Sequence, residues 1–450
     1  MPTVYPFRAI QYTTGRDLTK FVAPPYDVLD AAGKQRLLQQ EARNIVAIDL
    51  PHTPAKELGP PAAYEAAASL LQTWLSGGTL KQLDRPAMFA YRQTFRGADG
   101  RTVQRSGMTA CVETVPFGPR EGGGILPHEE TFSGPKEDRM ALMKATRTQL
   151  SPIFGLHADD RGLATSLLQK VMASRGPDHT ALTADGTQHE VWTVTDPATI
   201  KAYQDALAGE DIFIADGHHR YTTGLNYLKG LEGAGQVPID HAARRCMMVI
   251  VGMSDPGLVI WPTHRVLGGM KNYSFDAFVK AAAGVLHVNP APGGLANLEL
   301  EMASLTIPHT PLPTNVLGLY DFATKKCYTA TFARKDPLKD RFADKPSAWR
   351  MLDVALIQYC IVEGVCQPKL NDGQPVKWAF PHTIAELEEI GKGQETGAGG
   401  GAGFAQLAVI VQPTPLQAVR EVSRANQLMP QKSTFFYPKL ATGLFMNSLT

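Results

Sequence analysis

Apolar and polar positions follow the pattern of strands in some stretches of the chain and of helices in others. The clearest change from one pattern to the other lies near the middle of the chain. Residues 212–215 form an unbroken apolar run of the kind that builds a buried strand. From Tyr221 onward, apolar residues recur at helical spacing. Between these stretches, Asp216 and Gly217 are a turn signal, because glycine adopts a positive φ without steric cost. The pattern therefore predicts a strand, a tight turn and a helix.

The same analysis predicts helices and strands in mixed order over the whole chain. Helices are expected at residues 31–43, 61–76, 135–150, 161–175, 196–207, 273–289, 350–365 and 414–427. Strands or hairpins are expected at residues 44–50, 86–96, 103–115, 151–156, 180–194, 245–252, 258–267, 315–334 and 404–411. Interleaved elements of this kind indicate an α+β, or mixed α/β, fold with mixed sheets and flanking helices.

The length of 450 residues is about three times that of a typical domain. We expect an N-terminal α/β lobe at 1–180, a central module at 181–270 that carries the turn, and a C-terminal α/β lobe at 271–450. Loops from all three are expected to meet at one cleft.

Charge and cysteine content narrow the class of protein. The chain has 44 basic and 43 acidic residues and no basic block, which argues against nucleic-acid or membrane-surface binding. The five cysteines are scattered and form no CxxC pair, as expected for reduced thiols in a cytoplasmic protein without structural zinc. We find no signal peptide and no apolar run of about 18 residues that could cross a bilayer.

The central turn concentrates polar side chains where the predicted helix begins. His218, His219 and Arg220 follow Gly217 directly. A helix N-terminus offers unpaired N–H groups and a positive dipole, and an arginine can bind two oxygens of one anion. The functional interpretation is a phosphate or carboxylate site. The alternative is a structural turn whose histidines cap and pack.

A second polar loop precedes the helix predicted from residue 135. It holds His128 and Glu129, and the first turns of the helix hold Lys136 and Arg139. Basic residues at a helix N-terminus interact unfavourably with the helix dipole. A bound anion toward which Lys136 and Arg139 both point would explain their position. The alternative is a solvated helix start with internal salt bridges.

Two further segments carry candidate ligands. Tyr26 and Asp27 follow a rigid Pro-Pro stretch and form either a ligand loop or a structural turn. His264 and Arg265 lie in a strand that we expect beside the central strand, because consecutive strands usually pair.

The last candidate segment is rich in aromatic and cationic residues. Lys432, Ser433 and Thr434 form a turn that can hold phosphate through hydroxyl, N–H and ammonium groups, and Lys439 follows shortly after. The alternative is an aromatic plug with exposed lysines. Together the candidate loops are mainly cationic with a few carboxylates, which matches a phosphate-rich ligand with Mg²⁺.

Six motifs carry a resemblance to known families. The chain resembles a widespread prokaryotic family of uncharacterised proteins from about residue 4 to residue 446. The motifs that carry this resemblance are APPYDVL, HEETFSGPKEDR, LSPIFGL, IADGHHRYTT, PTHRVL and MPQKSTFFYPKLATGL. Residues 190–252 also resemble the nucleotide-binding module of ParB-type partition proteins and free serine kinases. That resemblance implies that Asp216, Gly217, His218, His219 and Arg220 lie at nucleotide phosphates. No helix-turn-helix is evident, which argues against a DNA role.

We therefore expect a nucleotide-dependent phosphotransferase, a kinase for a small hydroxylated metabolite, with free serine as one candidate. Its cofactors would be ATP, ADP or another nucleotide, and Mg²⁺. Arg220 and Lys136 would hold phosphates, and Asp216 would bind Mg²⁺ or position the acceptor. His218 or His219 would assist proton transfer, with Glu129 or Asp27 as the candidate base.

Two alternatives remain open. One is a non-catalytic nucleotide-binding regulatory protein. The other is a metal-dependent hydrolase that uses the histidines as ligands, although their spacing matches no common zinc pattern. The histidines concerned are His128, His218, His219 and His264. A homodimer is also left open.

Overall fold

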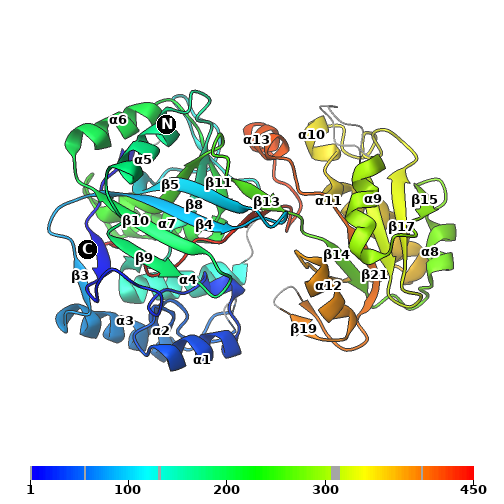
Figure 1. The fold of residues 1–450 in the computed structure, drawn as a ribbon, viewed down its shortest axis with the longest axis horizontal. Helices are drawn as coiled ribbons and strands as arrows, with labels where there is room; N and C mark the ends of the chain where they lie inside the picture. Colours follow the sequence, from blue (N-terminus) through cyan, green and yellow to red (C-terminus); the bar gives the residue numbers. More distant parts are fainter. Residues whose placement is uncertain (1–2, 55–56, 130–132, 306–314, 397–398) are drawn as a thin grey trace. The chain divides into compact units, whose positions relative to one another are not determined.

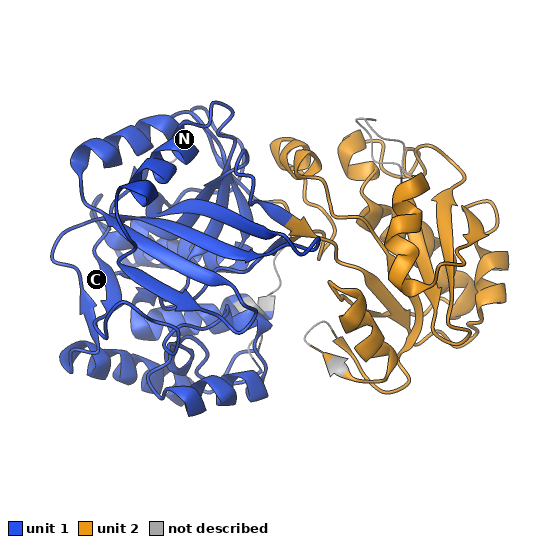
Figure 2. Cartoon of the chain, in the orientation of Figure 1, with its two compact units in different colours: residues 1–127, 131–259, 436–450 blue, residues 128–130, 260–435 orange. Residues whose placement is uncertain are grey.

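The structure is a computed structural model that describes residues 3–54, 57–129, 133–305, 315–396 and 399–450. It divides into two compact units (Figure 2). Unit 1 comprises Met1–Pro127, Thr131–Val259 and Phe436–Thr450, and unit 2 comprises His128–Glu130 and Ile260–Phe435. These units differ from the three consecutive segments expected from the sequence. The chain passes from unit 1 into unit 2 at two places, and each time it returns to unit 1.

Unit 1 is built on a mixed sheet of nine strands within the described residues (Figure 1). Their order is β6-β11-β8-β12-β5-β4-β10-β9, with β1 on β5. The strands are β1 Val4–Tyr5, β4 Met88–Arg96, β5 Thr102–Glu113, β6 Ile125–Leu126, β8 Ile153–His157, β9 His179–Leu182, β10 Gln188–Val194, β11 Ile212–Asp216 and β12 Arg245–Gly252. Two pairs, β6–β11 and β8–β12, are parallel and the others are antiparallel. The predicted mixed α/β class is confirmed.

A four-stranded sheet in unit 1 joins distant parts of the chain in the order β3-β2-β23-β7. Its strands are β2 Ala9–Tyr12, β3 Leu80–Gln82, β7 Thr148–Gln149 and β23 Met446–Ser448. The pairing of β2 with β23 places residues near the C-terminus beside residues near the N-terminus.

The helices of unit 1 cover its sheets. They are η1 Tyr26–Val28, α1 Ala31–Gln40, α2 Val46–Asp49, α3 Pro61–Ser76, α4 Ser133–Thr146, α5 Leu163–Ser174, α6 Pro197–Leu207, α7 His218–Ala234 and η2 Ala242–Arg244. Leu168 of α5 and Leu207 of α6 belong to one buried cluster with Met108 of β5 and Ile250 of β12. In Figure 1, α1, α2 and α3 lie together.

Residues 44–50 were expected to form a strand, and this prediction is wrong. The segment contains the helical turn α2 instead. The Asn44 side chain accepts from Val46 N at 3.0 Å and donates to Lys20 O and Val22 O, both at 2.8 Å, so it caps a buried turn. Ile48 and Leu50 are fully buried. A short apolar run buried on all sides has no period that separates a strand from a helix.

Unit 2 contains an antiparallel six-stranded sheet in the order β15-β17-β16-β21-β14-β18. Its strands are β14 Arg265–Gly268, β15 Leu286–Pro290, β16 Val316–Asp321, β17 Lys326–Phe332, β18 Lys377–Ala379 and β21 Ala405–Ile410. β13 Val259–Trp261 and β22 Phe435–Tyr437 lie where the chain passes between units, and β19 Glu395–Thr396 pairs with β20 Gly399–Gly400. The hairpin predicted at 315–334 is confirmed by β16 and β17.

Helices lie on both faces of this sheet. They are α8 Phe275–Ala281, η3 Leu295–Asn297, α9 Leu298–Leu305, α10 Ser347–Arg350, α11 Asp353–Leu356, the π-helical η4 Ile357–Leu370, α12 Ile384–Gly391 and α13 Leu416–Arg424. Phe278 of α8 and Ile361 of η4 pack with Leu319 and Val409, whereas Met302 of α9 packs in a second cluster. The helix predicted at 273–289 is only half right, because its second half forms β15.

No helix in the described part of the chain combines the length and the apolar character that a membrane crossing requires.

Candidate functional site

The central turn has the predicted strand-turn-helix form. Residues Ile212 and Ile214 of β11 are fully buried. Gly217 takes a φ of 91° and precedes the first residue of α7, His218, so the helix begins three residues earlier than its apolar spacing indicated. The residue at the N-cap position, Gly217, has no side chain to cap the helix. The first N–H groups of α7 and its positive dipole end therefore lie at this turn.

Asp216, the last residue of β11, pairs with two cations. Its Oδ2 accepts from Arg220 Nη2, and its Oδ1 lies 2.5 Å from Lys439 Nζ. Burial by itself would raise the pKa of Asp216, but Lys439 and Arg220 hold it well below its usual value. A Mg²⁺ ion at this carboxylate would lie beside two cations that repel it. We therefore interpret Asp216 as the group that orients Arg220 and Lys439.

Lys439 reaches the turn because the buried Arg105 fixes the backbone before it. The guanidinium of Arg105 donates to Tyr437 O at 3.0 Å and to Pro438 O at 2.6 Å. Gln93 Nε2 donates to Lys439 O at 2.9 Å. The C-terminal segment is thus attached to β4 and β5, and it supplies a cation that no local pattern connects with Asp216.

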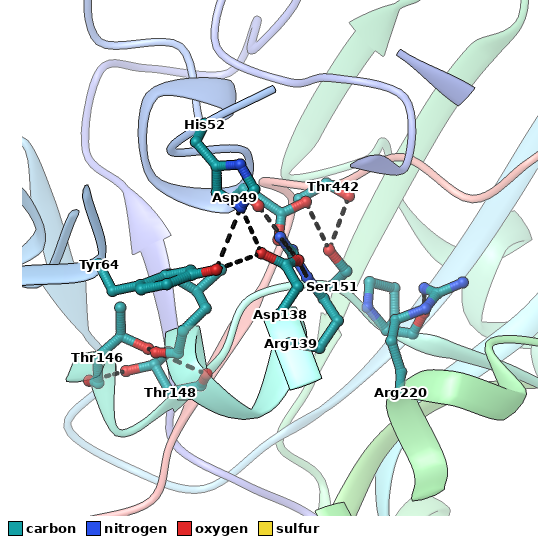
Figure 3. A network of polar contacts seen from close by, with 12 residues as sticks. Asp49, His52, Tyr64, Asp138, Arg139, Thr146, Thr148, Ser151, Arg220 and Thr442 are labelled. Atoms are coloured by element: carbon teal, nitrogen blue, oxygen red, sulfur yellow. Dashed lines mark hydrogen bonds and ion pairs between the residues drawn. The ribbon is translucent and has the colours of Figure 1, made fainter. Parts of the chain in front are cut away.

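Arg139 lies at the centre of a buried network in unit 1 (Figure 3). Its Nε donates to Asp138 Oδ2 at 2.7 Å, and its Nη1 donates to Asp49 O at 2.6 Å and approaches Asp49 Oδ1 at 3.3 Å. The side chains of Arg139 and Asp138 are 6% and 0% exposed. The alternative interpretation of this helix start, internal salt bridges with the adjacent Glu137 and Asp138, included one partner of Arg139, namely Asp138. Asp49 was not predicted, because it lies 90 positions away and carries no motif of its own.

Hydroxyl and imidazole groups complete this network. Tyr64 OH donates to Asp138 Oδ1 at 2.7 Å, and His52 Nε2 lies 2.7 Å from the same oxygen. Ser151 Oγ donates to Asp49 Oδ2 at 3.1 Å. Burial raises the pKa of Asp49, and Arg139 and Ser151 counteract that shift in part. Burial and the bond to Asp138 raise the pKa of Tyr64 to about 12.

A cavity of about 40 Å³ opens beside this network and beside Arg220. Its polar wall comprises Tyr26, Asp49, Arg139, Gln149, Ser151 and Arg220, and its other wall is mainly apolar. The Arg139 guanidinium lies 4.0 Å from the centre of the Tyr26 ring. A cavity needs a volume of roughly 10–15 Å³ to hold one water molecule. This cavity therefore has room for a small group such as a phosphate or carboxylate, and not for a nucleoside.

Four other predicted residues also lie in unit 1. Asp27 is half-buried, and its Oδ1 is a buried oxygen without a hydrogen-bond partner among the described residues. Lys136 is half-buried in α4, His218 is buried and His219 is half-buried. A buried carboxylate oxygen without a donor costs free energy.

Seven predicted residues lie in unit 2: His128, Glu129, His264, Arg265, Lys432, Ser433 and Thr434. Hydrogen bonds join some of these residues to one another. His128 Nε2 lies 2.8 Å from Thr434 Oγ1, and Glu129 Oε1 accepts from Lys432 N at 2.9 Å. The structure therefore divides the predicted site residues between the two units.

The prediction that His264 and Arg265 lie in a strand beside the central strand is wrong. β11 pairs with β6 and β8, whereas β14 pairs with β18 and β21 in the sheet of unit 2. Pro262 interrupts the predicted strand where the chain enters unit 2. His264 Nδ1 accepts from Val411 N at 3.3 Å, and burial lowers the pKa of His264 to about 3.

Residues 4–355 match the sequence model of a family described as "Protein of unknown function (DUF1015)". The chain belongs to the DUF1015 family. This match confirms the predicted resemblance to a family of uncharacterised proteins. The motif at residues 429–444 lies beyond the matched region. No curated protein matches this DUF1015 chain.

Solved structures give distant matches to this DUF1015 protein. "Free serine kinase in complex with AMP" has 13% identity and a TM-score of 0.32, covering 73% of this chain and 95% of that chain. "Conserved hypothetical protein from Pyrococcus furiosus" has 12% identity and a TM-score of 0.31, with coverages of 72% and 96%. "SbnI with C-terminal truncation from Staphylococcus aureus" has 11% identity and a TM-score of 0.29, with coverages of 71% and 82%. TM-scores below 0.5 do not establish a shared fold.

The histidines considered as metal ligands are divided between the units of this DUF1015 protein. His218 and His219 lie in unit 1, and His128 and His264 lie in unit 2. Among the residues that the structure describes, no group of three or more His, Cys, Asp or Glu side chains is placed to hold a metal ion. The geometry gives the metal-dependent hydrolase no support.

Proposed function

We propose that the protein is a nucleotide-dependent phosphotransferase that acts on a small hydroxylated metabolite, with free serine as the first acceptor to test. One observation carries the proposal: Arg220, oriented by Asp216, lies in the first turn of an uncapped helix and lines a cavity of about 40 Å³. A guanidinium beside a helix N-terminus favours an anion. The resemblance of residues 190–252 to a nucleotide-binding module points to the same ligand.

The size of the cavity limits how a nucleotide would bind. Only its terminal phosphate would enter, close to Arg220, and the nucleoside would lie outside the cavity. Lys439 and Lys136 would supply further positive charge to the phosphates. Phosphoryl transfer depends mainly on positioning and on neutralising charge, which is what such a set of cations provides.

Asp27 is the candidate general base. Its buried Oδ1 has no hydrogen-bond partner in the described residues, whereas Glu129 Oε1 already accepts from Lys432 N. In the proposed reaction, the acceptor hydroxyl oxygen attacks the terminal phosphorus, and the bond from phosphorus to the nucleotide oxygen breaks. The hydroxyl proton passes to Asp27, and His218 or His219 would assist proton transfer. The products are a phosphoester and the shortened nucleotide.

Mg²⁺ would offset part of the charge of the nucleotide phosphates. Asp216 fits that ion poorly, since Arg220 and Lys439 already pair with its oxygens.

The test compares Arg220→Ala with the wild-type protein. Nucleotide binding to the full chain is measured by calorimetry with ATP, ADP and AMP, and phosphoester formation from serine is followed by ³¹P NMR. Loss of the guanidinium should weaken nucleotide binding by about 2–5 kcal/mol if the site is desolvated. Arg16→Ala, at an exposed position of unit 1, is the matched control and should bind normally. Equal nucleotide affinity in Arg220→Ala and wild type would refute the role of Arg220.

A non-catalytic nucleotide-binding regulator is the second candidate. The observation in its favour is that Asp216, the carboxylate nearest Arg220, pairs with two cations and is poorly placed to accept a proton. Saturable nucleotide binding that depends on Arg220, without product from any hydroxylated acceptor, would identify this function.

A further inference from the structure

A second cavity, of about 340 Å³, lies wholly within unit 2. Its lining includes Arg265 of β14, Gln358 and Tyr359 of η4, Trp378 of β18, Phe380 and Gln431. This volume is in the range of small-molecule sites, roughly 300–1,000 Å³. The cavity is several times larger than the one beside Arg220, and it contains none of the residues assigned to phosphoryl transfer.

Arg265 gives this cavity a buried positive charge. The side chain is 2% exposed, and its guanidinium donates to Thr263 O at 2.5 Å and to Lys432 O at 2.9 Å. No carboxylate among the described residues forms an ion pair with it. Glu129 is the acidic group whose charge acts on Arg265, without an ion pair between them. Backbone carbonyls satisfy N–H groups but do not neutralise a charge, so an anion in the cavity would be stabilised.

Aromatic rings form the other notable part of the lining. Trp378 and Phe380 are stacked, with ring centres 5.9 Å apart and planes 8° from parallel. The Arg265 guanidinium lies 5.1 Å from the centre of the Phe380 ring. Trp378, Phe380 and Tyr359 are half-buried, so part of each side chain is accessible. Flat rings of this kind suit a flat ligand that stacks or lies edge-on.

Two amide side chains complete the recognition groups. Gln358 and Gln431 line the same cavity, and Gln431 is exposed. Each amide offers donors and an acceptor that can read the polar edge of a ring. One buried cation, three aromatic rings and two amides in one cavity are the ingredients of a specific small-molecule site.

We infer that unit 2 carries its own binding site for a small organic anion with a flat ring, whose anionic group pairs with Arg265. The shared chemistry of such ligands is a ring next to a carboxylate or a phosphate. This inference does not rest on the proposed phosphotransferase function, because it uses a different cavity in a different unit.

The test measures direct binding to the full chain by calorimetry. The probes are AMP, which joins a ring to a phosphate, and indole-3-acetate and benzoate, which join a ring to a carboxylate. Inorganic phosphate and acetate have the same charged groups without a ring. We expect at least one ring-bearing anion to bind at one site per chain, at least tenfold more tightly than its ringless counterpart.

Variants then assign the binding to this cavity. Gln431→Glu, at an exposed position, adds a carboxylate that would pair with Arg265 and repel an anion. Gln374→Glu makes the same charge change at an exposed position outside the cavity. We expect at least a tenfold loss of affinity in Gln431→Glu and in Arg265→Gln, and no change in Gln374→Glu. Because Arg265→Gln also removes backbone contacts, the Gln431→Glu result is the one that decides.

Arg220→Gln distinguishes this site from the one in unit 1. Ring-anion binding that survives Arg220→Gln and is lost in Gln431→Glu supports the unit 2 site, whatever the fate of the phosphotransferase proposal. Ring-anion binding that is lost in Arg220→Gln and kept in Gln431→Glu overturns it. Absence of binding by all ring-bearing probes at about 1 mM, the weak end of specific affinity, also overturns it.

Discussion

Lys439 Nζ lies 2.5 Å from Asp216 Oδ1, although the two residues are 223 positions apart in sequence. The contact joins the C-terminal segment to the turn between β11 and α7. It places a second cation next to Arg220, on a carboxylate that is ionised over the whole physiological pH range. The anion-binding character of the turn thus depends on a residue far away in the chain.

The first prediction concerns this contact. Lys439→Met should reduce the free energy of unfolding by about 2 kcal/mol at pH 7, because Asp216 loses one of its two cations in a largely buried setting. Asp216→Asn combined with Lys439→Met in a double-mutant cycle should give a coupling energy of similar size. Urea unfolding measures all four proteins. A coupling energy near zero would show that the contact is only a screened surface pair.

This contact also predicts a pH dependence. The folded pKa of Asp216 is lowered, so its stabilisation is present above the unfolded pKa of about 3.9 and is lost as pH falls toward the folded value. The stability difference between wild type and Asp216→Asn should therefore shrink as pH falls below about 4. A difference that stays constant across this range would contradict the assigned direction of the shift.

The second prediction concerns Arg139. Arg139→Met leaves the buried Asp49 and Asp138 without their cation and should destabilise the fold by about 3–5 kcal/mol at pH 8. The penalty should be smaller at pH 5, because carboxylates without a cation take up protons more readily in the folded state. Arg92→Met removes a more exposed pair with Glu190 and should cost less than about 1 kcal/mol. Urea unfolding at the two pH values measures the stability of both variants. An equal loss of unfolding free energy in Arg139→Met and Arg92→Met would argue against a tightly packed network.

The third prediction separates backbone strain from side-chain crowding at the turn. Gly217 has a φ of 91°, and a Cβ there would lie 3.0 Å from the Arg220 guanidinium. Gly186 has a φ of 79° and nothing within 4 Å of the same position. Both Gly217→Ala and Gly186→Ala should cost about 1–2 kcal/mol in stability. Only Gly217→Ala should also weaken nucleotide binding, as measured by calorimetry.

The fourth prediction concerns acid sensitivity in unit 2. Burial lowers the pKa of His264 to about 3, whereas an unfolded histidine has a pKa near 6.5. Because the unfolded state binds the proton more tightly, the stability should fall as pH drops below about 6.5, by about 1.4 kcal/mol per pH unit. His264→Gln should flatten this dependence, as followed by urea unfolding between pH 7 and 5. His287→Gln, at an exposed position of unit 2, is the control and should leave the slope unchanged.

Local patterns in the sequence were enough to predict several elements near the site. The strand, turn and helix around Gly217 follow from an apolar run, a residue that tolerates positive φ, and helical spacing. The helix at Pro197–Leu207 follows from Asp196, whose side chain accepts from Thr199 N at 2.8 Å as an N-cap should. Such features depend on neighbours within a few positions, so the sequence contains all the information that they need.

The prediction was less successful where burial or long-range pairing decides. Residues 44–50 were assigned to a strand because an apolar run has the same appearance in a buried helical turn. Arg139 was interpreted as an anion ligand, with internal salt bridges as the alternative, because nothing in the sequence indicates its pairing with the distant Asp49. His264 and Arg265 were placed near the central strand because consecutive strands usually pair, but the chain enters unit 2 at this point.

By itself, the sequence determined the mixed α/β class, the strand-turn-helix at Gly217 and the types of side chain available for binding. The tertiary structure alone decided which of them meet. It divided the candidate residues between two units, placed Lys439 on Asp216, and put Arg139 between two carboxylates. The physical reason is that propensity and capping act over a few residues, whereas ion pairs and cavities depend on chain segments that only the folded sheet brings together.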